Sequence, residues 1–71
     1  MISENPFIVD RWYLWSDGEL RKQRFRYATR EDAEHMCTVY LAMSDTTRIR
    51  LSKDSRFSSK PTVIKIWENG M

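Results

Sequence analysis

The sequence predicts a small α+β domain in which one helix packs on one face of a mostly antiparallel sheet of about four strands. Changes in the periodicity of apolar residues along the chain indicate this fold. Residues 7–27 alternate with a period of two around an Asp-Gly turn, residues 29–41 repeat with a period near 3.6, and residues 47–52 and 62–67 alternate again. The element order is therefore β-β-α-β-β, and residues 1–71 form a single domain because so short a chain supports one hydrophobic core.

The first two strands are predicted at residues 7–15 and 20–27. The first is rich in β-branched and aromatic residues, and Asp17-Gly18 is typical of a two-residue hairpin turn. Such a turn opposes Trp15 to Leu20, Tyr13 to Lys22, Arg11 to Arg24 and Val9 to Arg26. The more apolar face then carries Ile8, Trp12, Leu14, Phe25 and Tyr27, with Asp10, Arg21 and Gln23 as its polar members. We expect this face to lie under the helix.

The helix is predicted to begin after Thr29 and to end near residues 44–45. Thr29 is a suitable N-cap, and Glu31 and Asp32 suit the positive end of the helix dipole. One apolar stripe follows, consisting of Ala33, Met36, Cys37, Tyr40 and Leu41, with Val39 and Met43 widening it. This stripe is the expected partner of the apolar sheet face.

The second pair of strands is predicted at residues 47–52 and 62–67. Alternation places Ile49, Leu51, Ile64 and Ile66 inside and leaves Arg48, Arg50, Lys65 and Trp67 outside. Residues 53–61 between them are rich in Ser and basic residues and predict a mobile loop. In that loop, Lys53, Arg56, Phe57 and Lys60 could contact a phosphate backbone, or Phe57 could fold back over the core edge.

Several classes of function are disfavoured by the residues present. Cys37 is the only cysteine, so no intrachain disulfide forms, and no Cys/His cluster predicts a metal site. His35 and Cys37 point in different directions on a helix, and no Gly-rich phosphate loop occurs. We therefore expect a protein that is not an enzyme and has no cofactor. No apolar stretch predicts a membrane span, and a soluble, cytoplasmic location is expected.

The outer sheet face is the candidate binding surface, although the net charge is only +2. It is predicted to carry Arg11, Tyr13, Lys22, Arg24, Arg26, Arg48, Arg50, Lys65 and Trp67. Cations that replace counterions, interleaved with aromatic rings, suit nucleic acid, with duplex DNA favoured. The same residue types suit an acidic protein surface, as in a small inhibitor or adaptor of the kind that phages and mobile elements encode, which could also use an edge strand. A solvated face and a homodimer that buries it are further alternatives.

Residues 12–41 resemble the arm-type DNA-binding domain of tyrosine integrases and the related ethylene-response-factor domain. The likeness consists of an aromatic strand with Trp12, the Asp17-Gly18 turn, a basic strand with Arg24-Phe25, and the helix start "TREDAE" at residues 29–34. That family places a three-stranded sheet in the major groove, so the resemblance implies that Lys22, Arg24 and Arg26 contact DNA. The family has a strand before this hairpin and lacks the two later strands predicted here.

Overall fold

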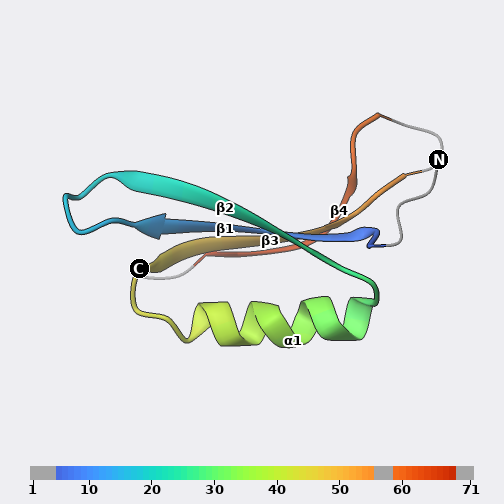
Figure 1. Ribbon diagram of the computed structural model, residues 1–71, viewed down its shortest axis with the longest axis horizontal. Helices are drawn as coiled ribbons and strands as arrows, with labels where there is room; N and C mark the ends of the chain where they lie inside the picture. Colours follow the sequence, from blue (N-terminus) through green and yellow to red (C-terminus); the bar gives the residue numbers. More distant parts are fainter. Residues whose placement is uncertain (1–4, 56–58, 69–71) are drawn as a thin grey trace.

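The computed structural model describes residues 5–55 and 59–68 and contains the expected elements in the expected order. The strands are β1 (Phe7–Leu14), β2 (Leu20–Tyr27), β3 (Thr46–Lys53) and β4 (Thr62–Glu68), and the helix is α1 (Arg30–Leu41). The strands form one antiparallel sheet of order β2-β1-β3-β4, and α1 lies along one face of it (Figure 1). The α+β prediction is confirmed. Arg56 and Phe57 of the predicted loop lie outside the described residues.

The topology places β1 between two strands that run in the same direction. Because β2 and β3 each pair antiparallel with β1, they are parallel to one another, and α1 supplies the connection between them. β4 then pairs with β3 at the edge of the sheet. The helix covers only one face, which leaves the opposite face without a second layer in the described part of the chain (Figure 1). We call this opposite face the open face.

The loop between β1 and β2 is one residue longer than predicted. The N–H of Gly18 donates to the carbonyl of Trp15 at 2.8 Å, and the N–H of Trp15 donates to the carbonyl of Glu19 at 2.8 Å. Gly18 has a φ of 85°, whereas Asp17 has no positive φ, so the type I′ turn does not form. Residues 16–18 instead make a three-residue loop that ends in a left-handed glycine.

This longer loop shifts the register of β1 by one residue and corrects the predicted pairs. The observed partners are Val9 with Phe25, Asp10 with Arg24, Arg11 with Gln23, and Tyr13 with Arg21. Because side chains alternate with a period of two, the shift exchanges the two faces of β1. Ile8, Trp12 and Leu14 were expected under the helix but share the open face with Lys22, Arg24 and Arg26. Arg11 and Arg24, predicted to oppose one another, are therefore not cross-strand partners.

The helix begins where the sequence predicts and ends earlier. Thr29 accepts a hydrogen bond from the N–H of Asp32 at 3.1 Å and has the extended backbone of an N-cap. The helix ends at Leu41, with Ala42 as its C-cap. Val39 and Met43 are exposed, so the apolar stripe is narrower than expected.

The core lies between α1 and the sheet. Its buried members are Val9, Ala33, Cys37, Tyr40, Ile49 and Leu51. The ring of Phe25 stacks on that of Tyr40 with 5.0 Å between centroids, and the hydroxyls of Tyr27 and Tyr40 are hydrogen-bonded at 2.8 Å. Each large apolar side chain buried here contributes about 1.5–3 kcal/mol, so this small cluster supplies most of the driving force for folding.

A bulge in the β3–β4 pairing corrects the prediction for β4. Leu51 pairs with Lys65 while Ser52 pairs with Val63, so one extra residue stands in β4. Ile64 and Trp67 therefore pack against the core, and Lys65 lies over the Trp67 ring at 5.0 Å. Ile66 was expected inside but lies opposite Arg50 and is exposed.

Candidate nucleic-acid interface

The open face carries a cluster of cations around the middle of β1. Two rows of cross-strand partners define its centre: Lys22–Trp12–Arg48–Glu68 and, one step along the strands, Arg24–Asp10–Arg50–Ile66. The next row along begins with Arg26 opposite Ile8. We refer to Lys22, Arg24, Arg26, Arg48 and Arg50 as the cationic cluster. These five residues are gathered from β2 and β3, the two parallel strands on either side of β1.

Trp12 is the aromatic residue at the centre of the cationic cluster. Its ring centroid lies 5.1 Å from the Lys22 Nζ, 5.1 Å from the Arg48 Cζ and 5.2 Å from the Arg50 Cζ. Each of these distances falls within the range of a cation–π interaction. The indole therefore holds cations from both neighbouring strands near the middle of the face.

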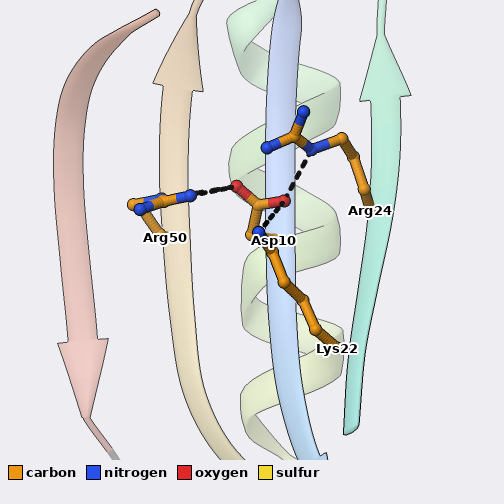
Figure 2. A network of polar contacts seen from close by, with 4 residues as sticks. All are labelled: Asp10, Lys22, Arg24 and Arg50. Atoms are coloured by element: carbon orange, nitrogen blue, oxygen red, sulfur yellow. Dashed lines mark hydrogen bonds and ion pairs between the residues drawn. The ribbon is translucent and has the colours of Figure 1, made fainter.

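Asp10 is a buried carboxylate beneath these cations, with 1% of its surface exposed. Its Oδ1 accepts from the Nε of Arg24 at 2.8 Å, and its Oδ2 accepts from the Nη2 of Arg50 at 2.9 Å and from the Nε of Arg50 at 3.3 Å. The Lys22 ammonium lies 3.9 Å from Oδ1 (Figure 2). Burial opposes ionisation, but the hydrogen bonds from Arg24 and Arg50 outweigh it and hold the pKa of this carboxyl below its ordinary value.

The outer members of the cationic cluster remain accessible. The side chains of Lys22, Arg24 and Arg26 are each more than two-fifths exposed. Arg26 makes an ion pair with Asp54 at 2.9 Å, at the end of β3. Because both partners of the Arg26–Asp54 pair stand at the surface, this ion pair contributes little to stability. The exposed parts of all three side chains remain able to meet a partner.

Arg11 and Tyr13 do not belong to this surface, contrary to the sequence prediction. The side chain of Arg11 is 8% exposed and donates to the Thr46 Oγ1 at 2.7 Å, to the Gln23 Oε1 at 3.0 Å and to the Asp45 Oδ1 at 2.6 Å. Its Cζ lies 4.6 Å from the centroid of the Tyr13 ring, which is also buried. The register shift turned both residues to the helix side, where Arg11 joins β1 to β2 and to the start of β3.

Lys65 and Trp67 are likewise on the helix side of the sheet because of the bulge in β4. Lys22, Arg24, Arg26, Arg48 and Arg50 are therefore the predicted site residues that the fold brings together. Sequence reasoning missed Asp10 and Trp12 as members of the same face. The signal that could have revealed them is a single acidic residue in a strand that pairs with a basic strand. Pairing Asp10 with Arg24 neutralises a charge that would otherwise be buried alone.

Cys37 is buried in the core, and burial raises the pKa of its thiol to about 11, so it is a poor nucleophile at neutral pH. Within residues 5–55 and 59–68, no group of three His, Cys, Asp or Glu side chains is placed to hold a metal ion. The same residues contain no helix that is both long and apolar enough to cross a bilayer.

Comparisons with family models, with curated proteins and with solved structures give no match to this chain.

Proposed function

We propose that this chain is a non-enzymatic nucleic-acid-binding module that docks duplex DNA through the open face of its sheet. The observation that carries the proposal is the gathering of five cations on the face that the helix leaves uncovered, three of them around the Trp12 ring. Asp10 and Glu68 are the acidic residues of the strand rows that share this face, and Asp10 is buried beneath the cations. The face therefore presents net positive charge to a partner.

The expected energetics follow from release of counterions. A protein that neutralises phosphates displaces condensed cations, and its affinity falls with salt in proportion to the number of contacts. If all five cations contact phosphates, the slope of log K against log salt is about −4.5 for B-form DNA. Affinity would then fall roughly 500-fold between 50 and 200 mM salt. A slope near this value is the quantitative signature of the proposed interface.

The shape of the face favours a duplex with its major groove. Three neighbouring strands span roughly 10 Å between the outer backbones, against a groove about 12 Å wide. Sheets and ribbons are known to read this groove. The resemblance to the integrase arm-type domain supports the same docking, because Lys22, Arg24 and Arg26 share the open face. β3 lies beside β1, so three strands are present although no strand precedes the hairpin within the described residues.

A protein partner is the second candidate, and one observation favours it. Leu14, Leu20, Val63 and Ile66 are all exposed, and their registers place them on the open face around the cationic cluster. Apolar side chains beside arginines are typical of protein interfaces. An inhibitor or adaptor that binds an acidic host protein would use this same face, and a homodimer would bury it.

A titration of short oligonucleotides tests the proposal. Duplex and single-stranded DNA of random sequence are titrated at two salt concentrations with wild-type protein and with the Arg24→Ala/Arg26→Ala double variant. The expected result is tighter binding to duplex, a steep salt dependence, and a slope reduced by about 2 in the double variant, because two phosphate contacts are lost.

The matched control removes two charges from the other side of the molecule. Arg21 lies on the helix side of β2 and Arg30 begins α1, and both are exposed. The Arg21→Ala/Arg30→Ala variant should keep most of the affinity and the wild-type slope. Equal losses in the two double variants would contradict docking through the open face. Absence of DNA binding at low salt, with specific binding of an acidic protein, would favour the second candidate, and a monomeric mass at high micromolar concentration would exclude the homodimer.

A further inference from the structure

We propose that Asp10 holds Arg24 and Arg50 as a two-guanidinium clamp that receives one phosphodiester group of a nucleic-acid backbone. This inference rests on the proposed function and assigns a role to Asp10, which within residues 5–55 and 59–68 is the buried acidic residue of the open face. Asp10 would act as a positioning residue, since it lies beneath the arginines and they would touch the phosphate.

The clamp is built across three strands. Asp10 on β1 is directly opposite Arg24 on β2 and directly opposite Arg50 on β3. The carboxylate divides its oxygens between them, with Oδ1 accepting from Arg24 and Oδ2 accepting from Arg50. Figure 2 shows the carboxylate between the two guanidinium groups, with Lys22 reaching it from the same strand as Arg24. One buried group therefore sets the orientation of side chains from both neighbouring strands.

Asp10 differs from the two arginines in its exposure to solvent. Asp10 is 1% exposed, whereas the side chains of Arg24 and Arg50 are 47% and 27% exposed. The carboxylate is thus out of reach of a large partner, and the guanidinium groups above it are not. Three cations surround this single negative charge, so the site still presents positive charge to an incoming phosphate.

The arginines keep most of their hydrogen-bond donors for a ligand. A guanidinium has five N–H donors, and Arg24 gives Asp10 only its Nε–H. Arg50 gives its Nε–H and one Nη2–H. Among residues 5–55 and 59–68, no hydrogen bond engages the terminal Nη groups of Arg24 or the Nη1 of Arg50. Guanidinium groups bind phosphate oxygens in pairs of parallel hydrogen bonds, which these remaining donors can supply.

Asp10 can increase the affinity for a phosphate despite its negative charge, because it orders the Arg24 and Arg50 side chains before binding. A free arginine on a surface loses rotamer freedom when it binds, and that loss weakens the complex. Here Asp10 imposes the order before the ligand arrives. The two effects of Asp10 on a polyanion are therefore opposite in sign, because its charge repels the phosphate while its hydrogen bonds prepare the donors.

The sign of the Asp10→Asn effect on duplex DNA affinity tests the clamp. If Asp10 acted only as a nearby negative charge, its removal would strengthen binding to DNA. The clamp predicts the reverse, a loss of about tenfold at low salt, which is the order expected when two side chains must be ordered during binding. Introduced into an Arg24→Ala/Arg50→Ala background, Asp10→Asn should no longer weaken binding, because there is nothing left to position.

Charge-preserving variants give a second, independent readout. Arg24→Lys and Arg50→Lys keep the charge but lose the planar donor set that Asp10 and a phosphate share, and each should weaken binding severalfold. Arg21→Lys is the matched control, because Arg21 is exposed on the helix side of β2, outside the cationic cluster, and this variant should keep the wild-type affinity. Loss in all three variants alike would contradict the clamp.

Folding is checked separately by circular dichroism and thermal melting, and affinities are compared where every variant is folded. If Asp10→Asn does not fold, the three lysine variants decide the question. Failure of the wild-type protein to bind DNA would refute the proposed function. Binding by wild type together with equal or tighter binding by Asp10→Asn would refute the clamp alone.

Discussion

Replacing Arg11 tests which binding surface is correct, the one predicted from the sequence or the one found in the fold. The sequence places Arg11 among the binding residues, whereas the structure buries it on the helix side of β1. Arg11→Met keeps an unbranched apolar stem in place of the aliphatic part of the side chain but removes the charge and every hydrogen bond of the guanidinium. We expect this variant to lose stability and, under the proposed function, to bind DNA as tightly as wild type.

The magnitude follows from the contacts of the guanidinium. The hydrogen bonds to Thr46 and Gln23 contribute about 1 kcal/mol each. The ion pair with Asp45 adds less than about 1 kcal/mol because that carboxylate is half exposed, and the contact with the Tyr13 ring adds roughly 0.5–1 kcal/mol. Relief of the buried charge returns about 1 kcal/mol of this total. The expected loss is about 2 kcal/mol, or roughly 8–16 °C in Tm for a domain of this size.

The assay combines thermal melting with duplex DNA titration on the same samples. Arg21→Met is the control, because Arg21 is on the same side of the sheet but exposed, and its ion pair with Glu19 is long at 3.6 Å. It should shift the melting temperature by less than about 3 °C. Folded Arg11→Met should bind DNA as Arg21→Met does. An unchanged melting temperature together with a loss of affinity equal to that of Arg24→Ala would refute the placement of Arg11.

Three further predictions concern the loop, the core and the buried carboxylate. Gly18→Ala should destabilise the fold by about 1–2 kcal/mol in urea titration, because a φ of 85° disfavours any residue with a Cβ, although the space around Gly18 is empty. Gly18→Asn should lose less stability, because asparagine tolerates the left-handed region better. Equal stability of wild type and both variants would contradict the left-handed loop. Cys37 should react with thiol reagents only when the protein unfolds, and fast labelling of the native protein would contradict its burial. Because burial raises the pKa of this thiol from 9.0 to about 11, the free energy of unfolding should fall as the pH rises from 9 towards 11. The pKa of Asp10 is lowered in the folded protein, so the unfolded chain takes up the proton first as the pH falls. The stability due to this carboxylate should therefore be present above its ordinary pKa of 3.8 and be lost as the pH falls below that value. Asp10→Asn should flatten that acid limb of the urea midpoint, and an unaltered limb would show that other carboxylates cause it.

Local pattern accounts for the elements that were predicted well. β2 was predicted with its observed ends, and its faces were correct, with Arg24 and Arg26 on the open face and Phe25 packed against Tyr40. The start of α1 was correct because Thr29 caps it through a bond to a residue only three positions away. Such signals lie within one turn or one strand and can be read from neighbouring residues.

The errors have a common cause in the pairing of strands. One additional loop residue between Trp15 and Glu19 exchanged the faces of β1, and one additional residue in β4 exchanged the predicted sides of Ile66 and Trp67. A shift of one residue reverses every side chain of a strand, so a small local uncertainty becomes a large error in the site. Asp10 could have corrected the first error, because only the observed register gives it cationic partners on both sides.

The sequence by itself determined the class of fold, the order of its elements, the position of the helix and the basic character of β2, because each depends on periodicity and turn chemistry over a few residues. Tertiary structure alone decided which residues of β1 and β4 join these basic residues on the open face. The bonds that set this arrangement join residues far apart in the chain, such as Asp10 and Arg50, which are separated by 40 positions. Burial of a carboxylate is tolerated only where such distant cations meet it, and that energetic condition cannot be read from either strand alone.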